Sequence, residues 1–300
     1  MKTGTAALLL LLLAATACGT DHPPAAPQDP TLQKDARAGS LAVSLDRPQE
    51  AITQYRRALH DAWARDDVTA IGDYGYDLAV AQLAANRPKD ALTTLHMVRD
   101  ELARRGGTAF AALDLAEATT DYRLGDLAQC DRLAARAATG GDAAVAGRAV
   151  FLRGLVADET NNVNGLDMAL AGLAQPAGPD QQADAEELRA RRDLRQGQYG
   201  AAYSEALHAT ELRRTLLDYR GMARALTVAG DAAAQSGKAD AAADLYLRAG
   251  QSAAAQGDAV NACPWLRRAV QLQNDPAVHE AADRAAQSLE SGASPGVRCL

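Results

Sequence analysis

A pattern of small and turn-forming residues recurs seven times along the 300-residue chain. In each copy, a small or apolar residue that we call the anchor is followed by further apolar residues four and seven positions later. Residues at these spacings share one face of an α-helix. Five positions before each anchor stands Gly, Asn or Asp, the residues that best tolerate a left-handed backbone, and twelve positions before it stands Gly or Ala. Each copy therefore predicts a helical hairpin, in which two helices approach closely around a tight turn.

The copies follow one another at intervals of 40, 39, 36, 36, 40 and 20 residues. Their anchors are Ala51, Ala91, Cys130, Leu166, Ala202, Ala242 and Ala262. Their turn residues are Asp46, Asn86, Gly125, Asn161, Gly197, Gly237 and Gly257. The small residues of their first helices are Gly39, Ala79, Ala118, Gly154, Ala190, Gly230 and Gly250. One match would mean little in an alanine-rich chain, but seven registers that agree at five positions indicate an array of hairpins.

This pattern resembles the tetratricopeptide repeat, which has Gly or Ala in its first helix and Ala, an aromatic residue or Leu, and Ala in its second. The resemblance covers about residues 32–275 and implies an all-α, right-handed superhelix (an α-solenoid) of about seven overlapping repeats. The last interval is too short for a whole hairpin, so we expect Ala239 to Gln256 to form one helix shared by two repeats. Beyond the repeats, Pro276 precedes a predicted helix over Ala277 to Leu289, which we expect to cap the open end of the array.

Two features depart from a regular array. Charged residues stand where the family often has a large apolar residue, directly before the small residue of the first helix: Glu117, Arg153 and Arg189. In addition, Pro176, Gly178 and Pro179 interrupt the array. That segment is either a longer loop between repeats or a hinge between two sub-arrays, and the periodicity that resumes in step favours the loop.

The composition favours helices over sheets and excludes one class of partner. The chain is 48% hydrophobic but only 4% aromatic, which suits closely packed helices and is poor material for strands. Its formal net charge is −7, and its Arg residues are mixed with Asp and Glu. Because nucleic-acid binding needs clustered Lys and Arg, we expect no nucleic-acid partner.

The first 17 residues have the features of an export signal. Lys2 supplies positive charge, an uninterrupted apolar run covers Ala6 to Ala15, and small residues lead to Cys18. The run is too short for a membrane-spanning helix of about 20 apolar residues. Residues 15–18 resemble the lipobox of bacterial lipoproteins, although Leu is more usual where Ala15 stands. The resemblance implies cleavage before Cys18 and lipidation of its sulfur, whereas the alternative is an ordinary signal peptide with a chance cysteine.

The expected organisation has four parts. A signal peptide covers residues 1–17, and a lipidated Cys18 with a flexible, proline-rich tether covers 18–31. The repeat domain covers 32–290, and a tail covers 291–300. By the sorting rule of the lipoprotein family, Gly19 after the cysteine favours the outer membrane, facing the periplasm. The membrane contact would be through the lipid anchor only.

The sequence shows no catalytic set, so we expect no enzyme, no cofactor and no metal site. The five histidines lack metal-ligand spacing: His22, His60, His96, His208 and His279. No glycine-rich phosphate loop, Gly-x-Ser-x-Gly elbow or haem attachment motif occurs. An enzyme would need a site assembled across repeats.

The family resemblance implies a concave groove lined by the first helices, where a protein or peptide partner would bind. By register, the candidate groove residues are Asp73, Tyr76, Val80, Leu115, Thr119, Tyr122, Arg148, Phe151 and Leu155. Later repeats add Asp184, Glu187, Arg191, Arg224 and Thr227. The alternative is that Tyr76, Tyr122 and Phe151 pack between repeats, and the sequence leaves this open. Apolar anchors beside charges suit an extended or helical peptide.

These features predict a lipid-anchored adaptor that mediates protein–protein interactions in the bacterial cell envelope, where related lipoproteins help to assemble envelope complexes. A second class is a regulatory or ligand-sensing repeat protein, which would need a cytoplasmic location. A third, less favoured class is an envelope enzyme with a site formed across repeats.

The cysteines predict one disulfide, between Cys263 and Cys299. Cys18 would be consumed by lipid, and Cys130 occupies a small buried anchor position, where it acts as an apolar residue. Export would place the two remaining thiols in an oxidising compartment. The alternative is that both thiols stay free.

Overall fold

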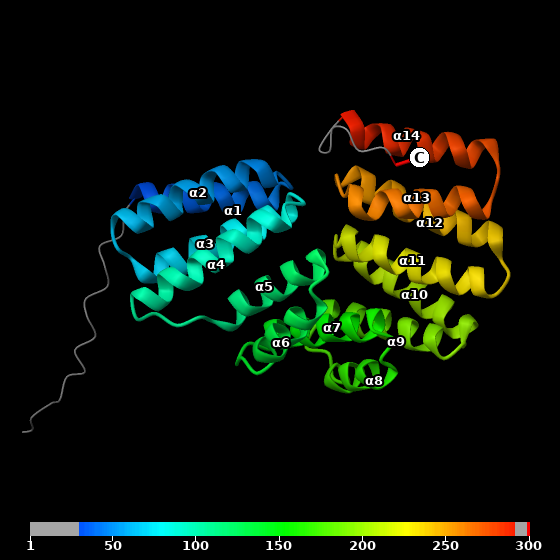
Figure 1. Cartoon of the computed structure of the whole chain (residues 1–300), viewed down its shortest axis with the longest axis horizontal. Helices are drawn as coiled ribbons and strands as arrows, with labels where there is room; N and C mark the ends of the chain where they lie inside the picture. The colour runs from blue at the N-terminus through cyan, green and yellow to red at the C-terminus, as the bar shows by residue number, and fades with distance from the viewer. Residues whose placement is uncertain (1–29, 292–298) are drawn as a thin grey trace, which may run out of the picture.

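The computed structural model describes residues 30–291 and 299–300. Over these residues the chain forms fourteen α-helices and no strand, and the helices follow one another along a curved array (Figure 1). The first seven are α1 (Pro30–Ser44), α2 (Pro48–Ala64), α3 (Val68–Ala84), α4 (Pro88–Arg104), α5 (Ala111–Leu124), α6 (Leu127–Ala137) and α7 (Ala143–Glu159). The others are α8 (Val163–Gly172), α9 (Pro179–Arg195), α10 (Tyr199–Thr215), α11 (Tyr219–Gln235), α12 (Ala239–Ala255), α13 (Ala259–Leu272) and α14 (Pro276–Ser291). The predicted all-α superhelical array is confirmed.

The hairpin turns have the backbone that the sequence predicts. All seven turn residues have positive φ, from 53° at Asp46 to 84° at Gly125. The same conformation also ends second helices at Asp66, Gly106 and Leu217, which the repeat pattern did not include. Glycine adopts it at no steric cost, and Asn and Asp tolerate it better than most residues.

The anchors form the contact between the two helices of each hairpin. All seven are fully buried, with 0% of their surface exposed. Where the first helix has glycine, a large side chain fills the space: it comes from the second helix at Gly39, Gly230 and Gly250, and from α9 at Gly154. A Cβ atom built on Gly39 would lie 2.8 Å from the Tyr55 ring, and one on Gly230 would lie 3.1 Å from the Tyr246 ring. Glycine therefore allows the helices to approach closely at these two positions, and the space is tighter at Gly39 than at Gly230.

Local signals explain where the helices begin. Pro48, Pro88 and Pro179 stand in the first turn of α2, α4 and α9, where the missing N–H costs nothing. Six other helices have an Asp or Asn cap whose side chain accepts a hydrogen bond from a first-turn N–H. These caps are Asp67, Asp126, Asp142, Asn162, Asp218 and Asp258.

The charged residues that depart from the family pattern pair with other charges. Each forms an ion pair in place of an apolar contact. The pairs are Glu117 with Arg99 (2.7 Å), Arg153 with Asp131 (2.8 Å) and Arg189 with Glu186 (2.6 Å). The Glu117 side chain is buried, so the array accepts a buried charge at a position where an apolar side chain would otherwise pack.

The C-terminal end of the array is closed as the sequence predicts. Helix α12 packs against both α11 and α13, so it is shared by two consecutive hairpins, and α14 covers α12 and α13. Cys263 of α13 and Cys299 are joined by a disulfide with their Cα atoms 4.6 Å apart, and both side chains are buried. Cys130 is a free, buried cysteine, as its anchor position implies.

The array continues across the Pro176–Pro179 segment. Helix α9 packs directly against α7, and Gln181 Nε2 donates to the carbonyl of Ala143 at 2.9 Å. In this structure the segment is a loop between repeats.

The array begins at Pro30, two residues before the predicted boundary. The signal peptide, Cys18, nearly all of the tether and most of the tail lie outside the described residues. Among the described helices, none combines the length and apolarity needed to cross a membrane.

Candidate partner-binding surface

The odd-numbered helices α3, α5, α7, α9 and α11 form one continuous surface on the inside of the curve. Each of them packs against the next odd-numbered helix along the chain. In Figure 1, α6 and α8 lie outside α5 and α7, and α4 faces α11 to α13 across the curve. We call this surface the inner face. It is the surface on which the sequence placed the partner-binding groove.

The predicted groove residues fall into two groups. Seven of them keep part of their surface exposed on the inner face: Asp73, Tyr76, Val80, Leu115, Thr119, Tyr122 and Arg148. Phe151 and Leu155 do not, because only 1% and 3% of their surfaces are exposed and both belong to the hydrophobic core around α6, α7 and α9. Their prediction as groove residues is therefore wrong.

Phe151 is buried because arginine side chains cover its ring. The guanidinium carbons of Arg148, Arg213 and Arg224 lie 4.8, 5.2 and 5.3 Å from the ring centroid. Guanidinium groups at this distance are attracted to the negative face of an aromatic ring. These arginines come from α7, α10 and α11, so the ring and its cover hold three repeats together.

The predicted groove residues Asp184, Glu187 and Arg191 are also buried, in an ion network that runs through the central repeats. Glu187 is the centre of this network: Arg224 Nε lies 2.6 Å from its Oε1, Arg213 Nη2 lies 2.8 Å from its Oε2, and Arg191 Nη2 lies 3.1 Å from its Oε1. Burial raises the pKa of Glu187, but the charges of Arg224, Arg213 and Arg191 outweigh burial and hold this pKa well below its usual range.

The network continues to the neighbouring carboxylates. Arg213 also pairs with Asp184 at 2.8 Å and Asp218 at 2.6 Å, and Arg191 pairs with Asp158 at 2.6 Å. These charged residues therefore hold the central repeats together rather than face a partner. The periodic pattern marked their positions as first-helix residues on the inner face, but it could not show that the curvature buries them.

Four arginines reach the accessible part of the inner face: Arg123 of α5, Arg148 of α7, and Arg220 and Arg224 of α11. We call them the arginine cluster. Arg148, Arg220 and Arg224 each lie beside a carboxylate. Arg123 instead donates to the main-chain carbonyl of Leu83 at 2.7 Å, in a partly buried hydrogen bond. Desolvation, followed by the charges of Arg220, Arg224 and Arg148, lowers the pKa of Arg123 to about 10, against an opposing effect of Asp258. This region therefore favours negative charge.

Arg123 and Arg220 were not among the predicted groove residues. Arg123 directly follows the predicted groove residue Tyr122. Including the residue next to Tyr122 in the candidate set would have found it. Nothing in the sequence pattern marks Arg220, because it reaches the inner face only through the curvature of the array.

The apolar part of the inner face lies on α3 and α5. The ring of Tyr76 packs edge-on against Phe110 with centroids 5.9 Å apart, and the Tyr122 hydroxyl donates to Glu159 at 3.4 Å. Burial raises the pKa of Tyr122 to about 12. Both rings pack between repeats and keep an exposed part, so their assignment to the groove stays a prediction.

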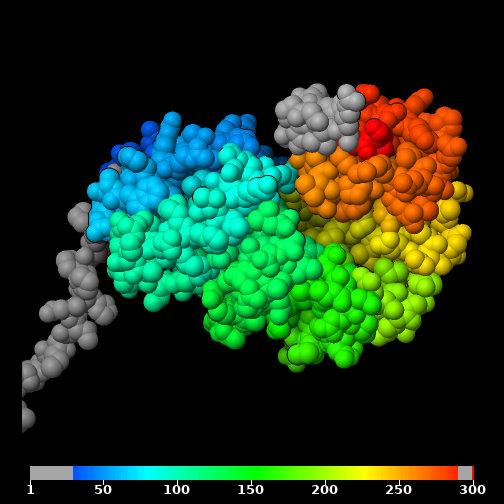
Figure 2. Space-filling view, viewed as in Figure 1, coloured from blue at the N-terminus to red at the C-terminus, as the bar shows by residue number. Residues whose placement is uncertain are grey.

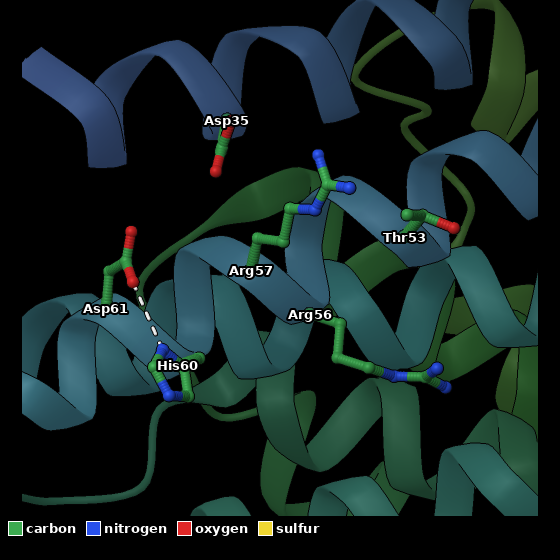
Figure 3. Close-up of a pocket in the computed structure, with 6 residues that line it drawn as sticks. All are labelled: Asp35, Thr53, Arg56, Arg57, His60 and Asp61. Carbon is green, nitrogen blue, oxygen red and sulfur yellow. Dashed lines mark hydrogen bonds and ion pairs between the residues drawn. The ribbon is translucent and has the colours of Figure 1, made fainter.

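A polar hollow lies elsewhere, over α1 and α2. Asp35, Thr53, Arg56, Arg57, His60 and Asp61 line it (Figure 3). His60 Nδ1 lies 3.1 Å from Asp61 Oδ1, but both residues come from one helix and the His60 ring is exposed. The hollow contains no set of nucleophile, base and orienting group. Over the described ranges, no three His, Cys, Asp or Glu side chains converge in a way that could hold a metal ion.

Comparisons with solved structures agree with the fold. Over 85% of this chain and 98% of the other, the structure resembles a tetratricopeptide repeat protein from Parabacteroides merdae ATCC 43184, with a TM-score of 0.50 and 15% identity. It also resembles a chain in the Cut9–Hcn1 hetero-tetramer of the APC/C, with a TM-score of 0.48, 12% identity and coverage of 85% and 52%. Scanned against protein-family models and against curated proteins, the sequence gives no match. The chain has the tetratricopeptide-repeat fold, a right-handed α-solenoid.

Proposed function

We propose that this chain is a protein-binding adaptor whose inner face holds a segment of a partner protein. The arrangement that carries the proposal is the position of Tyr76, Val80 and Tyr122 beside the arginine cluster on one continuous surface. Partly exposed aromatic and aliphatic side chains can anchor apolar residues of a partner. The arginines favour acidic side chains or a terminal carboxylate. The proposed partner segment therefore carries both apolar residues and negative charge.

We further propose that the adaptor works in the bacterial cell envelope and is held to the outer membrane through a lipid on Cys18. The support for this is the apolar run of residues 6–15 followed by Cys18 and by a segment with four prolines before the first helix. Each buried acyl methylene contributes about 0.8 kcal/mol, so several acyl chains would hold the array firmly. Cell fractionation tests the anchor: the wild type should enter the membrane fraction, and Cys18→Ala should leave it. A Cys18→Ala variant that stays with the membrane would exclude the lipid anchor.

Partner capture tests the binding surface. After in-cell crosslinking, the proteins captured by the wild type are compared with those captured by Arg123→Glu and by Tyr76→Ser combined with Tyr122→Ser. We expect both variants to lose at least tenfold of the captured partner while circular dichroism stays unchanged. The matched control is Arg132→Glu, because Arg132 is exposed on α6, outside the inner face, and its hydrogen bonds go to Gln129 of its own helix. Equal capture by wild type, control and variants would exclude the inner face as the binding surface.

A further inference from the structure

Residues far apart in the sequence meet where the curved array approaches itself. The turn between α3 and α4 contacts the start of α11 and the turn between α12 and α13. Arg220 Nη1 donates to Asn86 Oδ1 at 2.6 Å, and Arg220 Nη2 donates to the carbonyl of Ala84 at 2.8 Å. Asn86 Nδ2 donates to the carbonyl of Gln256 at 3.0 Å. Figure 2 shows the two parts of the array in contact at this point. We call these contacts the clasp.

The clasp uses the end of α3 as its acceptor. Ala84 lies in the last turn of α3, where main-chain carbonyls lack helical partners and carry the negative end of the helix dipole. Arg220 binds one of these carbonyls, and Arg123 binds the neighbouring carbonyl of Leu83. Asp258 lies 3.3 Å from Arg220 and helps to orient its guanidinium group.

Hydrogen bonds and one ion pair connect the two sides of the clasp in the described part of the chain. Among the described helices, none of α3, α4 or α5 packs extensively against α11, α12 or α13. Opening would therefore expose little apolar surface and break only a few hydrogen bonds. The clasp also brings Arg123 and Arg220 together on adjacent carbonyls, and these two like charges oppose each other.

We propose that the clasp is a latch that closes the array around its inner face and opens to admit the partner. This inference rests on the proposed function, because the surface that the latch guards is the proposed binding surface. Acidic side chains of a partner would compete with Ala84, Leu83 and Asn86 for Arg220 and Arg123. Opening and binding are therefore coupled through the same two arginines.

The substitution Asn86→Gly tests the latch with little change elsewhere. Glycine keeps the left-handed backbone of Asn86, whose φ is 57°, and removes the side chain that bonds to Arg220 and Gln256. The matched control is Asn161→Gly, which makes the same change at the same turn position of another repeat. The Asn161 side chain contacts Arg195 of the adjacent first helix and takes no part in the clasp.

Spin labels measure the closure. Lys89→Cys and Val260→Cys place labels on exposed positions on either side of the clasp, in the chain with Cys18→Ala. Cys130 is buried and Cys263 is bonded to Cys299, so the two introduced cysteines are the ones labelled in the folded protein. We expect a narrow distance distribution in the parent chain and in Asn161→Gly. In Asn86→Gly the distribution should broaden and lengthen, and more so with Arg220→Ala added.

Binding of a fluorescein-labelled oligoglutamate peptide measures access to the inner face. If the latch controls access, Asn86→Gly should bind this peptide at least threefold more tightly than the parent chain and Asn161→Gly. Unchanged label distances would overturn the latch. Longer distances with unchanged peptide affinity would show that the clasp holds the array but does not control access. If no variant binds the peptide while the distances lengthen, the acidic-partner proposal fails, although the clasp still closes the array.

Discussion

The N-terminal repeats, formed by α1 to α4, and the central repeats, formed by α7 to α11, have the same hairpin pattern but different interiors. In the N-terminal repeats the large buried side chains are aliphatic or aromatic, and the buried polar side chains are Gln82 and Thr94, which hydrogen-bond to each other at 2.9 Å. In the central repeats Asp184, Glu187 and Arg213 are almost completely buried. Small residues and turns determine each hairpin in both regions. Ion pairs between hairpins occur in both, but in the N-terminal repeats Arg105 pairs with the exposed Asp66, whereas in the central region the pairs are almost completely buried.

This difference affects function as well as stability. On the central inner face the acidic side chains Asp184 and Glu187 are paired with arginines of the same chain. They are therefore not available to bind a partner. The exposed part of the inner face lies where the apolar repeats meet the arginine cluster. The proposed binding surface is therefore displaced toward α3 and α5, relative to a groove that runs evenly along all first helices.

The largest effect is expected from Glu187→Gln in the central repeats. The substitution leaves Arg191, Arg213 and Arg224 without their shared carboxylate in a buried site. Removing one partner of a buried ion pair costs about 3–5 kcal/mol of unfolding free energy. Chemical denaturation at neutral pH measures the loss. Glu50→Gln is the control, because Glu50 pairs with Arg47 on the surface and its loss should be small.

The pH dependence of this loss gives a second check. The pKa of Glu187 is lower in the folded state than in the unfolded chain, so its stabilising effect is present above the unfolded pKa and disappears as the pH falls. The difference between wild type and Glu187→Gln should thus be constant from neutral pH to about 5 and shrink below about 4.5. A constant difference down to pH 3 would contradict the ion network as its cause.

Leu95→Ala is the corresponding test in the N-terminal repeats. Leu95 is fully buried in the core between α3, α4 and α5, so its truncation leaves a cavity. We expect a loss of about 3 kcal/mol, because deletion of a buried Leu side chain removes transfer free energy and packing contacts. This loss should not change between pH 4 and 8. A strong pH dependence would show that the two regions do not differ as described. Met168→Ala, at a side chain that is 70% exposed, is the control.

The two regions also differ in how far the sequence predicts them. The hairpins were predictable because small anchors and left-handed turns recur at fixed spacing, and each acts between residues close together in the chain. Burial of Glu187 was not predictable, because a charged residue on the inner face is expected to be solvated until the curvature of the array is known. For Phe151 the sequence left both the groove and the contact between repeats open. The contact of Asn86 with Arg220 joins residues 134 positions apart, and no periodic pattern marks it.

Gly237→Val tests the turns, which the two regions share. Gly237 has a φ of 74°, and a Cβ atom built there meets nothing within 4 Å, so any cost comes from the backbone alone. A β-branched residue in the left-handed region should lower the unfolding free energy by about 1–3 kcal/mol. Gly200→Val is the matched control, because Gly200 also has open space but lies in the first turn of α10 without a positive φ. Equal denaturation midpoints for the two variants would contradict the role of the left-handed turn.

The smallest effect is expected from Asp121→Asn, and its sign is opposite to that of Glu187→Gln. Asp121 of α5 is buried like Glu187, but its Oδ2 atom is without a hydrogen-bond partner. Burial, with the nearby charges of Glu117 and Asp126, raises the pKa of Asp121 to about 6. Because this pKa is higher in the folded state than in the unfolded chain, ionisation of Asp121 destabilises the fold as the pH rises from about 4 through 6.

Replacement of Asp121 by the uncharged Asn should therefore raise the unfolding free energy at pH 7.5 by about 1–2 kcal/mol. The gain should fall toward zero as the pH decreases to 4, where wild-type Asp121 is protonated in the folded state. Denaturation at a series of pH values measures it, and Asp100→Asn, an exposed carboxylate of α4, is the control. A loss of stability in Asp121→Asn at pH 7.5 would mean that the carboxylate has a stabilising partner. In that case a buried carboxylate would not need an arginine beside it to stabilise this array, and the contrast with Glu187 would fail.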